Sequence, residues 1–132
     1  MFRSKQVDKS ENKKIGFIGE EIAKKHLKDC GYKIIEKNFL TKIGEIDIIA
    51  KQKDEYVFVE VKTSKYYKNS SFSPEIRVNK KKLKNITNAS EIYRLEKRFQ
   101  SKQKWRVDVM SVILDENFLM RSIEHFENIF MD

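Results

Sequence analysis

The sequence predicts a single α/β domain, in which a mixed five-stranded sheet is flanked by helices. Several short segments alternate apolar and polar residues with a period of two, which is typical of strands, and two longer segments repeat apolar residues every three or four positions, which is typical of helices. The expected order is helix, three strands, helix, two strands. A chain of 132 residues can form one domain with a core of ordinary size. We expect residues 1–12 to form a mobile tail and residues 13–132 to form the domain.

The clearest strand patterns lie between residues 43 and 63 and indicate a hairpin. The polar pair Lys53 and Asp54 separates the two halves. A hairpin centred on that pair places Ile49 opposite Phe58, and the apolar faces of the two strands then match. This register predicts that the charged residues of the hairpin lie on the face that carries Ile49 and Phe58. In both halves apolar residues occupy every second position: Ile46, Ile48 and Ala50, then Val57, Val59 and Val61.

The predicted register gathers three acids and one lysine on one face. Asp47 lies opposite Glu60, and Glu45 lies opposite Lys62. Opposed carboxylates repel each other, and burial increases the cost. Either the face is solvated and Lys62 neutralises it, or the acids bind a hard cation such as Mg²⁺, which accepts carboxylates, water and substrate phosphate. In the second case the lysine could hold a phosphate or help to deprotonate water.

The remaining elements follow from capping signals and periodicity. Ser10 is a candidate N-cap for a first helix that ends near Cys30, with Gly31 as the residue after its C-terminus. Glu20 lies at the edge of this helix's apolar face. A second helix can start at residues 73–75 or at Asn79, and its main part is expected over residues 80–99. The other expected strands cover residues 32–39, 105–114 and 118–125.

The net charge of +8 belongs to one segment of the chain. Residues 76–106 contain eleven Lys or Arg and two acids, whereas the rest of the chain contains 17 basic and 18 acidic residues. Such a segment indicates a polyanionic partner or, alternatively, a solvated helix face. Because lysines bind phosphate as point charges, their excess over arginine favours binding to the backbone and shape of a nucleic acid. The loop of residues 64–73 adds aromatic residues among lysines, which could stack on unpaired bases or cover a subunit interface.

Several classes of protein are disfavoured. No apolar run approaches the eighteen or so residues of a membrane helix, and no signal-peptide core is visible, so we expect a cytoplasmic protein. Cys30 is the only cysteine, which excludes an internal disulfide. His26 and His125 have no partners at metal-ligand spacing, and we expect them to be structural or surface residues. We expect Asp108, an acid inside a strand, to pair with a base such as Arg106.

A series of motifs resembles a known family. Asp47, followed after twelve residues by Glu60-Val61-Lys62, resembles the PD-(D/E)xK nuclease motif. Over about residues 13–130 the chain resembles the YraN-type family of uncharacterised bacterial predicted endonucleases, which are similar to archaeal Holliday-junction resolvases. The further segments that carry the resemblance are Gly16–Ala23, Gly31-Tyr32, Asn38-Phe39, Gly44–Asp47, Phe58–Thr63 and Arg106–Val109.

The resemblance implies a restriction-endonuclease-like fold and a metal-dependent endonuclease that hydrolyses phosphodiester bonds in DNA, including branched or junction DNA. Asp47 and Glu60 would hold Mg²⁺ or Mn²⁺ with the carbonyl of Val61. Lys62 would act on the attacking water, and Glu20 would orient water or a second metal. From the charge pattern and the hairpin register we further expect Glu45 to support the site through Lys62, and Lys80 also matches the lysine that begins the second helix in the family. The residues expected to contact nucleic acid are Lys65, Lys68, Lys80, Lys81, Lys82 and Lys84.

Two other interpretations stay open. The chain could be a non-catalytic module that binds nucleic acid or docks a partner protein on a nuclease fold, although two opposed carboxylates have no use in a pure binder. RNA could replace DNA as the substrate. A homodimer is also expected, since resolvase-like nucleases pair to cut two strands and most oligomers of this kind are two-fold symmetric.

Overall fold

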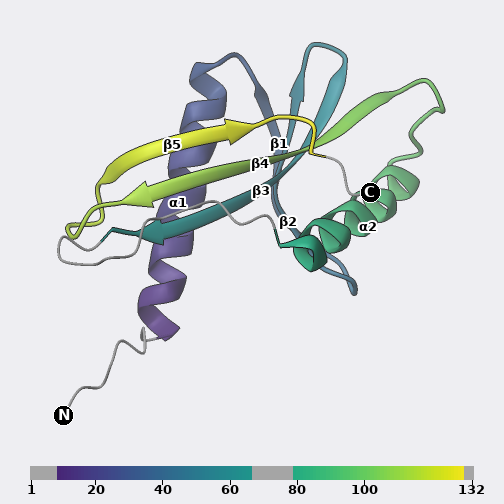
Figure 1. Cartoon of the computed structure of the whole chain (residues 1–132). Coiled ribbons are helices and arrows are strands. Elements are labelled where there is room, and N and C mark those ends of the chain that lie inside the picture. Colours follow the sequence, from purple (N-terminus) through teal and green to yellow (C-terminus); the bar gives the residue numbers. More distant parts are fainter. Residues whose placement is uncertain (1–8, 67–78, 130–132) are drawn as a thin grey trace.

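The computed structural model describes residues 9–66 and 79–129 (Figure 1). The predicted order of one helix, three strands, a second helix and two strands is confirmed. No helix among these residues is long and apolar enough to cross a membrane. The elements are α1 (Lys9–Asp29), β1 (Lys33–Leu40), β2 (Glu45–Gln52), β3 (Glu55–Lys65), α2 (Lys80–Glu96), β4 (Lys104–Leu114) and β5 (Met120–Phe126).

The five strands form one mixed sheet in sequence order, β1-β2-β3-β4-β5. The pairs β1–β2, β2–β3 and β4–β5 are antiparallel, whereas the central pair β3–β4 is parallel. A parallel connection needs a crossover, and the segment that contains α2 provides it. The predicted hairpin register is confirmed where Ile49 pairs with Phe58 and Ile48 with Val59.

The two helices cover opposite faces of the sheet (Figure 1). Burial of apolar side chains on both faces explains why the central strands contain three consecutive buried residues. The core under α1 contains Ile15, Ala23, Leu27, Tyr32, Ile48, Ala50, Val57, Val59, Met110, Val112 and Leu114. The core under α2 contains Ile46, Ile49, Phe58, Leu83, Ile86, Ala89, Tyr93 and Val107.

The structure corrects the start of the first helix. Residues from Lys9 onward are already helical, so Ser10 is inside α1 and is not its N-cap, and residues 9–12 do not belong to the tail. The physical reason is tertiary: Glu11 in the first turn forms an ion pair with Lys65 at the end of β3, 3.1 Å apart. Residues 1–8 lie outside the described residues. The predicted end is confirmed, since Gly31 follows the helix with φ of +92°.

The second helix begins where Asn79 predicts it. The Asn79 side chain accepts hydrogen bonds from the backbone N–H groups of Lys81 and Lys82, as an N-cap does. The helix ends at Glu96, three residues before the expected end, because Arg98 adopts a left-handed conformation with φ of 53°. The alternative start at residues 73–75 and most of the aromatic loop lie outside the described residues. The last strand starts at Met120 and not at residue 118.

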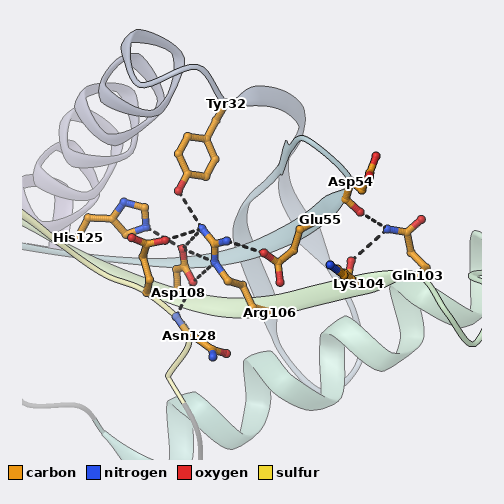
Figure 2. A network of polar contacts seen from close by, with 10 residues as sticks. Tyr32, Asp54, Glu55, Gln103, Lys104, Arg106, Asp108, His125 and Asn128 are labelled. Atoms are coloured by element: carbon orange, nitrogen blue, oxygen red, sulfur yellow. Dashed lines mark hydrogen bonds and ion pairs between the residues drawn. The ribbon is translucent and has the colours of Figure 1, made fainter.

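A buried ionic network joins four segments of the chain near the start of β4 (Figure 2). Arg106 donates from Nε to the Oδ1 of Asp108 (3.0 Å), from Nη1 to Glu55 (2.7 Å) and from Nη2 to the Tyr32 hydroxyl (2.8 Å). The Nε2 of His125 lies 2.7 Å from the Oδ2 of Asp108. The expected ion pair of Asp108 with Arg106 and the structural role of His125 are therefore confirmed.

The charge of Asp108 is compensated within this network, which explains how a fully buried acid is tolerated. Burial alone would raise the pKa of Asp108, but hydrogen bonds from His125, Arg106 and the backbone N–H of Asn128 lower that pKa below its ordinary value. Asp108 is therefore held ionised by its neighbours, and the structure gives it a structural role.

Candidate metal and catalytic site

The candidate site lies where β2 leaves β3. The β2–β3 backbone pairing ends at Ile48 and Val59, so the predicted backbone pairs Asp47–Glu60 and Glu45–Lys62 do not form. Instead, the carboxylate of Asp47 accepts a hydrogen bond from the backbone N–H of Val61, 2.8 Å away. A side chain therefore replaces the backbone acceptor that a continuing strand would supply.

The prediction that the acids share a face with Ile49 and Phe58 is also wrong for β2. Ile46 and Ile49 both pack in the core under α2, although strict alternation would place them on opposite faces. The alternation of β2 therefore breaks at Asp47 and Ile48. The partner strand is irregular at the same level, since Asn38 of β1 has φ of 53°. This break turns Glu45 and Asp47 toward α1.

Three carboxylates meet as a result. One oxygen each from Glu20 of α1 and from Glu45 and Asp47 of β2 lie within 4.8 Å of one another. Asn38 holds two of them, because its Nδ2 donates to Glu20 (2.9 Å) and to Glu45 (2.8 Å). We call Glu20, Glu45 and Asp47 the acidic cluster. Glu45, which the sequence assigned to a supporting role through Lys62, is here a direct member of it.

Close packing of α1 against β3 brings Glu20 to the cluster. A Cβ atom built on Gly19 would lie 1.8 Å from the Oγ1 of Thr63 and 2.7 Å from its Cβ, so only glycine allows this approach. The residue after Gly19 is Glu20, whose side chain thereby reaches the start of β2, where Glu45 and Asp47 lie. The small residue beside the acid thus has a specific steric function.

Burial and, after it, repulsion between neighbouring carboxylates both disfavour the ionised acids in this region. The pKa of Asp47 is raised from 3.8 to about 8, first because the group is buried and second because Glu60 repels its charge, with further contributions from Glu20 and Glu45. The hydrogen bond from Val61 opposes this shift but does not cancel it. Burial likewise raises the pKa of Glu60. The charge of Lys82, whose Nζ lies 4.0 Å from the Oε1 of Glu60, partly offsets this increase. The site therefore favours an added positive charge.

The donor set fits a hard divalent cation. It consists of carboxylate oxygens, which Mg²⁺ and Ca²⁺ prefer. Oxygens on opposite sides of one Mg²⁺ are about 4.2 Å apart, and around Ca²⁺ about 5 Å. The separation of up to 4.8 Å within the acidic cluster is therefore close to one coordination shell. Small side-chain rotations or bridging water would complete the fit for Mg²⁺.

Residues of β3 border the cluster on its other side. The N–H and C=O groups of one strand residue point to the same neighbour, so the Val61 carbonyl faces the side on which Asp47 lies. Glu60 and Lys62 are two residues apart on β3 and project to one face of it. The carboxylates therefore surround the free edge of β3, with Glu20 on the α1 side and Glu60 near Lys82 of α2.

The predicted lysine contacts differ in their surroundings. Lys80, Lys81, Lys82 and Lys84 are exposed at the start of α2, as phosphate contacts require. Lys65 is only 11% exposed and pairs with Glu11, so in this arrangement it is not available to phosphate. Lys68 lies outside the described residues. Sequence reasoning did not assign site roles to Asn38 and Gly19, whose only signal was their place within the segments that carry the family resemblance.

The fold and the site define a mixed α/β protein with an acidic cluster at the edge of its central parallel strand pair, suited to a divalent cation. The chain belongs to the family described as "Uncharacterised protein family UPF0102", whose sequence model matches residues 19–112. This match spans the acidic cluster, β3 and most of β4.

Individual relatives agree with this assignment. A UPF0102 protein of Clostridium botulinum (strain Kyoto / Type A2) is 42% identical over 119 residues, which are 90% of this chain and 95% of the relative. A UPF0102 protein of Fervidobacterium nodosum is 42% identical over 130 residues, 98% of this chain and 92% of the relative. Among solved structures, a fdxN element excision controlling factor protein from Anabaena variabilis is 17% identical, with a TM-score of 0.34, over 80% of this chain and 97% of that chain.

Proposed function

We propose that this protein is a metal-dependent endonuclease that hydrolyses phosphodiester bonds in DNA, including branched DNA, and acts in the cytoplasm. The observation that carries the proposal is the acidic cluster with Glu60 beside it, next to a lysine two residues further along β3. The resemblance of Asp47 and Glu60-Val61-Lys62 to the PD-(D/E)xK motif supports the same chemistry and a restriction-endonuclease-like fold.

Each residue has a role that follows from its position. Glu20, Glu45, Asp47 and Glu60 would hold Mg²⁺ or Mn²⁺ with the Val61 carbonyl. A bound divalent ion supplies Lewis-acid stabilisation of the phosphate and activation of water. The Lys62 ammonium would stabilise the negative charge that builds on the phosphate and orient the attacking water. The exposed lysines at the start of α2 would bind the neighbouring phosphates.

Cleavage of a substrate panel tests this proposal. The purified protein is incubated with Mg²⁺ or Mn²⁺ and with single-stranded, duplex, flap and four-way-junction DNA, plus an RNA duplex. Asp47→Asn, purified in parallel, identifies any contaminating nuclease, because Asn cannot replace a carboxylate ligand. We expect metal-dependent cleavage by the wild type and none by Asp47→Asn. Equal cleavage by both proteins, or no cleavage of any substrate, would remove the nuclease assignment in favour of a binding module.

A second comparison separates catalysis from binding. Because Lys62 acts mainly on the transition state, Lys62→Ala should lower the cleavage rate about a hundredfold or more and change DNA affinity little. The matched control is Lys80→Ala, an exposed lysine at the start of α2, which should weaken binding modestly and leave the rate at saturating DNA unchanged. An effect of Lys62→Ala on affinity alone would contradict the catalytic role.

A further inference from the structure

A hollow lies on the protein at the end of α2 remote from Lys82. Its volume is about 320 Å³, at the small end of the range of ligand pockets, which is about 300–1,000 Å³. Its walls come from the last turns of α2, from the following loop and from the start of β4. The residues that matter for its chemistry are Arg94, Leu95, Phe99 and Trp105, together with one acid, Glu91.

A stacked pair forms one wall of this hollow. The guanidinium carbon of Arg94 lies 3.9 Å from the ring centroid of Trp105, and Phe58 meets the same indole at a steep angle. The indole is 36% exposed, and the neighbouring Leu95 is 70% exposed. A partly exposed indole with a planar guanidinium stacked on it offers a flat surface on which another planar group can stack.

The Nε of Arg94 is buried and has no hydrogen-bond partner among residues 9–66 and 79–129. A buried donor without an acceptor costs free energy, because it has lost its hydrogen bond to water without a replacement. A ligand that brings a carbonyl or ring-nitrogen acceptor against the guanidinium would offset that cost. The wall therefore favours a planar ligand that carries acceptors at its edge.

The surroundings are basic. From Glu91 to Lys104, the segment that lines the hollow, the chain carries five Lys or Arg and two acids, and Lys97, Arg98, Lys102 and Lys104 are all exposed. Positive charge beside a stacking surface is the combination that single-stranded nucleic acid requires, because the charges bind the backbone and the flat groups bind the bases.

We infer that this hollow binds an unpaired nucleobase of a single-stranded segment, which stacks on the Arg94–Trp105 pair. Arg94 lies twelve residues after Lys82, or about 18 Å along the helix at 1.5 Å per residue. This inference rests on the proposed function and names its substrate class: DNA that is unpaired where it passes the far end of α2, about 18 Å along the helix from Lys82, as in a flap or an opened junction.

Tryptophan fluorescence tests the inference directly, because Trp105 is the only tryptophan of the chain. The protein is titrated in EDTA with a short oligothymidylate and, as a control, with an abasic strand of the same length, while anisotropy of a labelled end reports binding. We expect the oligothymidylate to quench the emission saturably and the abasic strand to bind without quenching it. A strand that binds to saturation but leaves the emission unchanged, or equal quenching by both strands, would overturn the assignment.

A matched pair of variants locates the effect. Arg94→Lys keeps the charge but removes the planar group, so affinity for oligothymidylate should fall about fivefold or more. Arg98→Lys makes the same exchange outside the hollow and should change affinity less than twofold. Equal losses in both variants would refute the site. Binding of a protein at this hollow, without binding of either DNA strand, would refute it as well.

The two proposals can fail separately. The fluorescence titration needs neither metal nor cleavage, so quenching without nuclease activity would leave the base site standing and remove the endonuclease. Cleavage by the wild type with unchanged tryptophan emission would support the endonuclease and remove the base site. If both hold, Arg94→Lys should reduce cleavage of flap DNA more than cleavage of plain duplex.

Discussion

The acidic cluster makes a quantitative prediction about stability. At pH values between the ordinary pKa of 3.8 and about 8, the folded protein keeps a proton on Asp47 that the unfolded chain has lost. The free energy of unfolding therefore decreases as the pH rises through this window, and the full loss is reached above about pH 8. About 4 pH units at about 1.36 kcal/mol each give a loss on the order of 5 kcal/mol.

Asp47→Asn removes this titration while its side-chain carbonyl can still accept the hydrogen bond from Val61. In EDTA, the variant should therefore be more stable than the wild type at pH 8.5 by several kcal/mol, and the difference should shrink toward pH 4. Urea unfolding at the two pH values measures it. Asp54→Asn, in the exposed turn between β2 and β3, is the control and should follow the wild type. A difference in pH dependence below about 1 kcal/mol would refute the electrostatic argument.

Three further predictions concern metal, packing and the ionic network. Binding of Mg²⁺ should release protons below pH 8, because the carboxylate ligands must be ionised. Calorimetry in buffers of different ionisation enthalpy measures this release, and zero release would contradict the raised pKa of Asp47. Gly19→Ala should lower the Tm strongly, because its Cβ would overlap Thr63. The control Gly16→Ala, whose Cβ would meet nothing within 4 Å, should be neutral or slightly stabilising. Similar Tm values for the two variants would count against the close contact between α1 and β3. Asp108→Asn should cost about 1.5–3 kcal/mol in urea unfolding, because it removes a buried charged acceptor and leaves Arg106 only the more exposed Glu55 and Glu127 as counter-charges, and a cost under about 1 kcal/mol would show that solvent reaches the network.

The sequence predicted the sheet well where side-chain alternation decides the structure. The register of Ile49 with Phe58 follows from matching apolar faces, because a slip of one residue would move every side chain of one strand to the opposite face of the sheet and away from its partners in the core. The same reasoning failed at Asp47, where the strands separate. There the acceptor of the Val61 N–H is a carboxylate, and periodicity carries no information about such a replacement.

The candidate site was predictable only in part for a related reason. Alternation alone could not place Glu20 beside Asp47, because their proximity depends on the packing of Gly19 against Thr63, 44 positions apart in the chain. The family resemblance supplied Glu20. Likewise, the burial of Lys65 depends on Glu11, 54 residues earlier, and no local pattern indicates that contact.

The position of Arg106 two residues before Asp108 has a consequence for the order of folding. The two side chains lie on the same face of one strand, so β4 carries its own counter-charge and can enter the centre of the sheet as a locally neutral segment. Tyr32, 74 residues away from Arg106, joins only when the end of α1 has docked. We therefore expect Tyr32→Phe to accelerate unfolding and leave the folding rate nearly unchanged. The Tyr32 hydroxyl would then accept its hydrogen bond from Arg106 only after the sheet has assembled.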